Sequence, residues 1–189
     1  MTETPNPHIV DADALTGEMH PIRRVVVALG SNLGERLTAL QGAVDALADT
    51  PDVWLTSVSG VYETDPVDAP DGSKPYLNAV VLLDTTLPAH RLMERALAVE
   101  IAFDRERSDI RNAPRTLDVD LIQVGDRRAD DELLQLPHPR AHERGFVLKP
   151  WHDLEPDAVL LDAGPIAELL EKVDLAGVRP REDLVLEMH

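Results

Sequence analysis

Runs of apolar residues along the chain predict four strands, of which the first is buried. The clearest covers residues 24–29, which include three successive valines. Residues 53–62 alternate enough between apolar and polar positions to form a second strand, and residues 76–83 form a third. The last strand begins at Asp118, just before a short apolar pair.

Between these strands, apolar residues recur at spacings of three and four, the pattern of an amphipathic helix. The first helix follows residues 24–29 and ends near Pro51, and Ser31 or Asn32 could cap it. Its apolar stripe is Leu33, Leu37, Leu40, Val44 and Leu47. The second helix starts at Pro88, a residue suited to a first helical turn. Its buried side is Leu92, Ala96, Val99 and Phe103.

The predicted order is strand, helix, strand, strand, helix, strand. This βαββαβ order is typical of the α+β ferredoxin-like fold, in which an antiparallel sheet carries its helices on one face. Residues 63–75 join the second and third strands through three prolines and a glycine. Loops of this length in compact domains are often binding loops. We therefore predict a ligand cleft formed by long loops.

One domain accounts for most of the chain. Residues 1–22 are polar and aperiodic, which predicts a disordered N-terminal extension. Residues 23–176 form the domain, with one helical turn at 140–145 and a short helix at 166–173. Residues 177–189 are predicted to be a loose C-terminal tail.

Composition narrows the class of protein. The chain has 189 residues, is 43% hydrophobic and contains no cysteine, so disulfides and thiolate metal sites are excluded. No apolar run approaches the roughly 18 residues of a membrane span. A net charge of −17 argues against nucleic-acid binding, because such a surface repels phosphate backbones. A cytoplasmic enzyme fits this composition.

The densest chemistry lies between Arg105 and Asp120, which reads RERSDIRNAPRTLDVD. Residues two apart on a strand share a face, so Asp118 and Asp120 project together. Paired carboxylates suit Mg²⁺, and arginine forks suit phosphate. The stretch therefore indicates a site for a metal and nucleotide phosphates. A solvated strand edge beside a salt-bridged loop explains the same residues equally well.

The turn at 30–34, Gly-Ser-Asn-Leu-Gly, joins a strand to a helix through glycines, as phosphate loops do. It lacks the Gly-Lys-Ser/Thr sequence of a Walker loop. A tight connection between strand and helix is the favoured interpretation.

Taken together, the motifs resemble the 6-hydroxymethyl-7,8-dihydropterin pyrophosphokinase family of folate biosynthesis. The resemblance covers roughly residues 24–165, and five ordered matches make it far more specific than any single motif. The matching segments are VALGSNLG at 27–34, VYET at 61–64, YLNA at 76–79, PRTLDVD at 114–120, and PH at 137–138 followed by RGF at 144–146. The family has a ferredoxin-like core, which agrees with the order of elements.

The resemblance implies transfer of the β,γ-diphosphate of ATP, as one unit, to the hydroxymethyl group of the pterin, leaving AMP. It implies two Mg²⁺ ions held by Asp118 and Asp120, and catalytic roles for Arg105 and Arg115. It places the pterin against Thr64, Asp65, Val67, Tyr76, Asn78, Asn112 and Phe146. It places ATP against Met93, Leu97, Glu100, Arg107, Arg111, Leu121, Gln135, His138 and Arg144. Asn112 departs from the family, in which many members carry a tryptophan at this position.

Two other functions are compatible with the same residues. A metal-dependent phosphoester hydrolase would use water in place of the pterin, and a ferredoxin-like nucleotide-binding module would bind without turnover. We also expect a monomer that binds neither nucleic acid nor membranes and that can contact neighbouring enzymes of the folate pathway.

Overall fold

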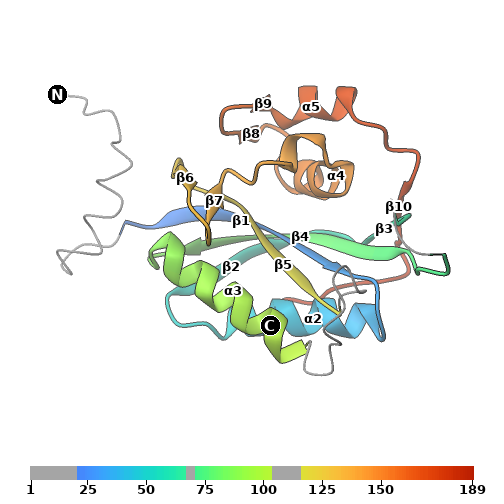
Figure 1. Cartoon of the computed structure of the whole chain (residues 1–189), viewed down its shortest axis with the longest axis horizontal. Helices are drawn as coiled ribbons and strands as arrows, with labels where there is room; N and C mark the ends of the chain where they lie inside the picture. Colours follow the sequence, from blue (N-terminus) through green and yellow to red (C-terminus); the bar gives the residue numbers. More distant parts are fainter. Residues whose placement is uncertain (1–20, 67–70, 104–115) are drawn as a thin grey trace.

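The structure is a computed structural model that describes residues 21–66, 71–103 and 116–189. Its centre is an antiparallel sheet with the order β10-β3-β4-β1-β5, in which β2 also pairs with β4 (Figure 1). The six strands are β1 (Arg23–Ser31), β2 (Val53–Val58), β3 (Tyr62–Thr64), β4 (Tyr76–Thr85), β5 (Asp118–Val124) and β10 (Val178–Pro180). The predicted strands are therefore all present, and the second is divided into β2 and β3.

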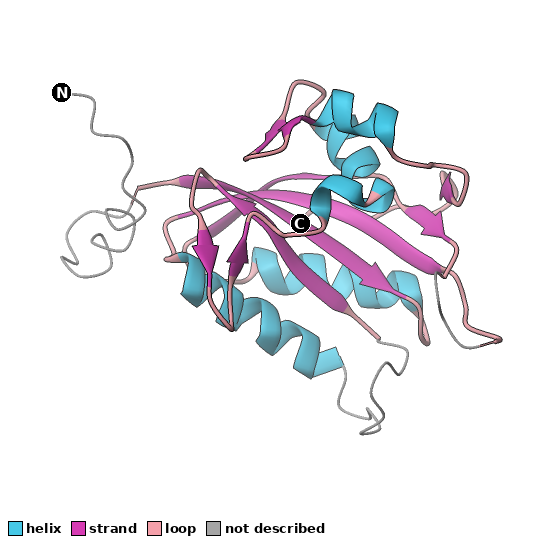
Figure 2. Ribbon diagram, turned by 45° about the horizontal axis from the view of Figure 1, so that its top comes forward, coloured by secondary structure: helices cyan, strands magenta, loops and turns pink. Residues whose placement is uncertain are grey.

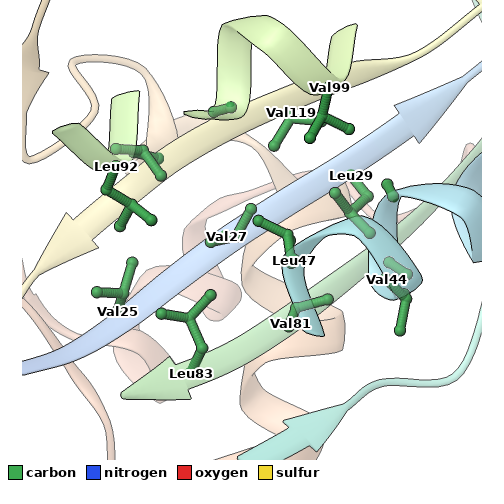
Figure 3. Packing of buried hydrophobic residues seen from close by; sticks show 14 of the residues in the cluster. Val25, Val27, Leu29, Val44, Leu47, Val81, Leu83, Leu92, Val99 and Val119 are labelled. Atoms are coloured by element: carbon green, nitrogen blue, oxygen red, sulfur yellow. The ribbon is translucent and has the colours of Figure 1, made fainter. Parts of the chain in front are cut away.

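Helices α2 (Arg36–Ala48) and α3 (Ala89–Phe103) pack side by side on one face of the sheet. The buried residues of these helices meet alternate residues of β1, β4 and β5 in the main hydrophobic core, which includes Leu40 and Leu121. Figure 3 labels other members of this core: Val25, Val27, Leu29, Val44, Leu47, Val81, Leu83, Leu92, Val99 and Val119. The helices approach closely at Gly42, where a Cβ would lie 2.1 Å from Cζ of Phe103. The ferredoxin-like fold class is confirmed.

The predicted Ser31 or Asn32 cap is wrong, because α2 begins at Arg36 with Glu35 as its N-cap residue.

The prediction had helices on one face alone, but the structure adds a layer on the other face. Helix α4 (Gly145–Leu154) follows the 3-10 turn η1 (Ala141–Glu143), and α5 (Ile166–Lys172) packs on α4 (Figure 2). Trp151 of α4 is 1% exposed and lies in a second core with Val26, Val80 and Leu82. The face opposite α2 and α3 is therefore covered in part. Short hairpins flank this layer: β6 (Ala129–Asp130) with β7 (Gln135–Leu136), and β8 (Val159–Leu160) with β9 (Gly164–Pro165).

The loose tail predicted for residues 177–189 is wrong. Residues Val178–Pro180 form β10, which pairs with β3, and Leu186 is buried in the main core. A three-residue strand that includes a proline has no period to detect in sequence, although proline is tolerated on an edge strand. The predicted N-terminal extension lies, apart from residues 21–22, outside the described residues. Among the helices of the described ranges, none has the length and hydropathy needed to cross a membrane.

Candidate active site

The register of the sheet brings residues of three strands into one row. Gly30 of β1 pairs with Asn78 of β4 on one side and with Asp118 of β5 on the other. Directly paired residues of antiparallel strands share a face. Asp120 lies one row along, opposite Ala28, whose side chain belongs to the second core. The two aspartates and Asn78 therefore point to the face on which α4 packs.

Gly30 leaves the middle of this row without a side chain. A Cβ at Gly30 would lie 3.1 Å from Oδ1 of Asn78 and 3.7 Å from Cδ1 of Tyr76. The sheet surface between Asn78 and Asp118 is therefore main chain. Glycine in a strand is typical of places where a ligand or another backbone approaches closely.

Asn78 is buried and held in one orientation. Its Nδ2 donates a hydrogen bond of 2.7 Å to Oγ1 of Thr64, a buried residue at the end of β3. Thr64 pairs with the half-buried Tyr76 in the ladder between β3 and β4. Because Nδ2 is committed to Thr64, Oδ1 of Asn78 faces Gly30. Four of the predicted pterin contacts, including the adjacent Asp65, thus lie together at this end of the sheet.

Arg144, which directly precedes α4, lies near Asp120, and Phe146 of α4 lies near Arg144. Nη1 of Arg144 lies 4.0 Å from Oδ2 of Asp120, whose side chain is 41% exposed. The guanidinium carbon of Arg144 lies 5.6 Å from the centre of the Phe146 ring, within cation–π range. The second layer of helices therefore completes a site whose other wall is the sheet.

His138 lies in the same neighbourhood. Its backbone N–H donates to the carbonyl of Ile122 in β5 at 2.8 Å, and its Nδ1 accepts a 3.1 Å hydrogen bond from the backbone N–H of Arg140. Partial burial lowers the pKa of His138; the negative charge of Asp120 opposes this shift, and the charges of Arg144 and Arg140 add to it. The neutral ring that results carries its proton on Nε2, since Nδ1 is an acceptor. His138 can therefore donate a hydrogen bond to a phosphate oxygen.

The other predicted nucleotide contacts within the described ranges lie on or near β5, at the edge of the sheet. Glu100 of α3 accepts a 2.8 Å hydrogen bond from the backbone N–H of Val119. Leu121 is buried in the main core, and Met93 packs against this core. Both residues therefore lie on the face of the sheet opposite the aspartates. Leu97 is half-buried on α3, and Gln135 is exposed on β7. These residues surround β5 rather than joining the row at Gly30.

The donor set of the site suits a hard divalent cation. Asp118 and Asp120 supply carboxylate oxygens from one face of one strand, and Mg²⁺ is usually bound through one or two carboxylates plus phosphates and waters. Within the described part of the chain, no group of three or more His, Asp or Glu side chains could hold a metal by itself.

Residues 26–156 match the family model of 7,8-dihydro-6-hydroxymethylpterin-pyrophosphokinase, abbreviated HPPK. The chain belongs to the HPPK family. Three relatives named 2-amino-4-hydroxy-6-hydroxymethyldihydropteridine pyrophosphokinase support this: those of Pseudomonas aeruginosa (40% identical, covering 83% of this chain and 96% of the relative), Methylorubrum extorquens (38%, 82% and 96%) and Mycobacterium tuberculosis (39%, 81% and 85%). The activity of this HPPK chain is pyrophosphoryl transfer to hydroxymethyldihydropterin in folate biosynthesis.

Solved structures agree with the HPPK fold. Wild-type HPPK-DHPS of Plasmodium falciparum with pterin and p-hydroxybenzoate matches with a TM-score of 0.63 at 14% identity, covering 85% of this chain and 44% of the solved chain. An HPPK-DHPS in complex with substrates matches with a TM-score of 0.63 at 10% identity, covering 80% and 43%. The chain thus spans less than half of each solved protein, and the likeness shows the fold.

Some predicted HPPK site residues lie outside the described residues: Val67, Arg105, Arg107, Arg111, Asn112 and Arg115. Two further positions near the site are not among the residues predicted from sequence. Gly30 was interpreted as part of a tight connection, although a glycine closing a buried strand is itself a signal of close approach. Tyr62, which pairs with Asn78, donates its hydroxyl to Asp153 of α4 and so links β3 to that helix.

Proposed function

We propose that this HPPK chain transfers the β,γ-diphosphate of ATP, as one unit, at the open end of the sheet. The hydroxymethyl oxygen of the pterin attacks the β-phosphorus, the bond from that phosphorus to the bridging oxygen of the α-phosphate breaks, and AMP leaves. The hydroxyl proton is released. The observation that carries this proposal is the row formed by Asn78, Gly30 and Asp118, because it sets an amide and a carboxylate on either side of bare main chain.

The pterin subsite is assigned to the Asn78 side of that row. Because Oδ1 of Asn78 faces Gly30, it can accept a hydrogen bond from a ring N–H or amino group of the pterin. Phe146 offers an aromatic face for stacking, and Tyr76 and Thr64 fill the wall behind Asn78. Asp65 follows Thr64 and its carboxylate pairs with Arg179, so Asp65, like Val67 and Asn112, remains a predicted contact.

The phosphate subsite is assigned to Asp118 and Asp120. Two Mg²⁺ ions are the proposed metals, and when bound they would neutralise phosphate charge and fix the phosphate oxygens. Arg144 and His138 lie beside Asp120 and would donate hydrogen bonds to phosphate oxygens. Arg105 and Arg115 are proposed to stabilise charge on the transferred group, and Arg107 and Arg111 to contact the nucleotide.

ATP is proposed to extend from the aspartates around the edge strand β5. An edge strand has main-chain groups that a ligand can reach. Of the predicted contacts, Leu121 belongs to β5 itself, Glu100 bonds to its backbone, and Gln135 lies on β7. The chain is proposed to act as a cytoplasmic monomer that can contact neighbouring enzymes of the folate pathway.

Analysis of the nucleotide products tests the reaction. Incubation with ATP, Mg²⁺ and 6-hydroxymethyl-7,8-dihydropterin should yield AMP and pterin diphosphate in equal amounts, with no AMP when the pterin is omitted. AMP formed without pterin would favour a hydrolase, ADP would exclude diphosphate transfer, and binding without product would favour a nucleotide-binding module.

Gly30→Ala tests the floor of the pterin subsite. The new methyl group would lie 3.1 Å from Oδ1 of Asn78 and fill the space assigned to the pterin. We expect KM for the pterin to rise roughly tenfold or more, the usual effect of one methylene in a fitted pocket. Steady-state kinetics with the pterin varied at saturating ATP measures it.

Gly60→Ala is the matched control, because a Cβ at Gly60 meets no atom within 4 Å. Its KM for the pterin should stay within about twofold of that of the unmodified enzyme, as for most surface substitutions. Equal kinetics for the two variants would move the pterin away from Gly30.

A further inference from the structure

The strand β10 lies at the edge of the sheet and covers β3, whose last residue is Thr64. Val178 pairs with Thr64 and Pro180 with Tyr62. Two further backbone hydrogen bonds extend the contact: the N–H of Asp65 donates to the carbonyl of Gly177 at 3.1 Å, and the N–H of Arg181 donates to the carbonyl of Val61 at 2.8 Å. The segment that carries Thr64 is therefore held along its whole length by the C-terminal region.

An arginine cluster reinforces this contact on the opposite face of β3. Glu63 alternates with Thr64 and so points away from the pterin subsite. Its carboxylate is 17% exposed and has three guanidinium partners: Arg181 at 2.9 Å, Arg179 at 3.3 Å and Arg36 of α2 at 3.4 Å. Arg36 also donates to the carbonyl of Pro75, next to Tyr76, at 2.7 Å. The cluster thus links β10, β3 and the start of β4 from behind.

Arg179 reaches further than its neighbours. Besides Glu63, its Nη2 donates to Oδ1 of Asp65 at 2.9 Å. Asp65 directly follows Thr64, and Thr64 accepts the hydrogen bond that orients Asn78. Arg179 is therefore linked to Asn78 through the carboxylate of Asp65, the peptide bond between Asp65 and Thr64, and the hydroxyl of Thr64.

The region beyond β10 is anchored as well. Leu186 is buried in the main core, and Gln41 of α2 exchanges two hydrogen bonds of 2.8 Å with the backbone of Glu187. These contacts keep β10 in place. Residues 177–189 lie outside the segment 26–156 that matches the family model.

We propose that β10 is a clamp on β3, and that Arg179 and Arg181 are positioning residues that fix Thr64, and through it Asn78, for the pterin. Neither arginine touches substrate in this arrangement. Their effect is on the orientation of the pterin-binding amide, and the inference rests on the pterin subsite proposed above.

Arg179→Ala tests the clamp by kinetics. We expect KM for the pterin to rise roughly five- to tenfold while kcat and KM for ATP change less than about twofold. The reason is that Asn78 is proposed to bind the pterin and not ATP. Arg179→Lys should recover part of the loss, since a single ammonium can hold one carboxylate but lacks the planar fork.

Arg128→Ala is the matched control. Arg128 forms a comparable two-bond pair with Asp162 at 2.8 and 2.9 Å, away from β3. Its KM for the pterin should not change. The clamp is refuted if Arg179→Ala leaves KM for the pterin unchanged, or if kcat and both KM values change together.

A readout without turnover separates the clamp from the reaction. The side-chain amide protons of Asn78 report its hydrogen bond to Thr64 in an NMR spectrum of the free enzyme. Arg179→Ala should shift these resonances, whereas Arg128→Ala should not. A shift in an enzyme that makes no pterin-dependent AMP would support the clamp and refute the proposed reaction, whereas unshifted resonances in an active enzyme would refute the clamp alone.

Discussion

Asp120→Asn is expected to lower kcat by at least about a thousandfold, or about 4 kcal/mol of transition-state stabilisation. The amide keeps the size of the carboxylate and removes its charge, which the proposed metal and phosphate site needs. The side chain is 41% exposed and its contact with Arg144 is long at 4.0 Å, so the free energy of unfolding should change by less than about 1 kcal/mol. Single-turnover kinetics and a thermal melt measure the two effects.

Asp84→Asn is the matched control for this change. Asp84 also carries a negative charge on the sheet, but it lies towards the far end of β4, where it pairs with Arg24. Its turnover should stay near that of the unmodified enzyme. If Asp120→Asn keeps near-normal turnover in Mg²⁺, the metal site has been placed on the wrong residues. A higher Mg²⁺ requirement in Asp120→Asn, and not in Asp84→Asn, would give direct support.

Trp151→Ala is expected to cost about 3 to 5 kcal/mol of stability, as for other buried aromatic side chains. Trp151 is 1% exposed and fills the second core between α4 and the sheet, so its removal leaves a cavity. For a domain of this size, the melting temperature should fall by about 10 °C or more. Calorimetry or circular dichroism measures the loss.

Trp54→Ala is the control, since Trp54 is the other tryptophan of the chain and is 51% exposed on β2. Its stability should change by less than about 1 kcal/mol. A comparable loss in both variants would mean that the α4 layer adds little to the fold.

Because α4 also carries Phe146, Trp151→Ala should weaken pterin binding even at temperatures where the protein is folded.

Much of the fold could be predicted because its elements have strong local periods. The apolar run at 24–29 and the stripe that includes Leu40 and Leu47 identified β1 and α2, and both residues are buried in the main core. The alternation around Asp118 and Asp120 also predicted that they share a face, away from Val119, and the sheet register agrees.

The short helix predicted at 166–173 is present as α5, but α4 and β10 could not be predicted, for physical reasons. Helix α4 contains Pro150 within its ten residues, and proline removes a helical hydrogen bond and argues against a helix in sequence. The strand β10 has only three residues and depends on its pairing with β3, which is distant in sequence. Contacts of that kind are set by tertiary structure and leave no local pattern.

The residue types of the candidate site could be predicted from the sequence, but the relative positions of those residues could not. The sequence indicated Asn78, Asp118 and Phe146, but the position of Gly30 between Asn78 and Asp118 depends on the register of three strands. The orientation of Asn78 depends likewise on Thr64.

The bare surface at Gly30 also has a consequence for inhibitor resistance. An inhibitor that lay against this surface would contact main-chain atoms, which point mutations do not remove. Every replacement of Gly30 adds atoms within about 3.1 Å of Oδ1 of Asn78, and those atoms would obstruct the pterin that is proposed to lie there as well as the inhibitor. Escape mutations at this position should therefore carry a cost in growth wherever folate must be made.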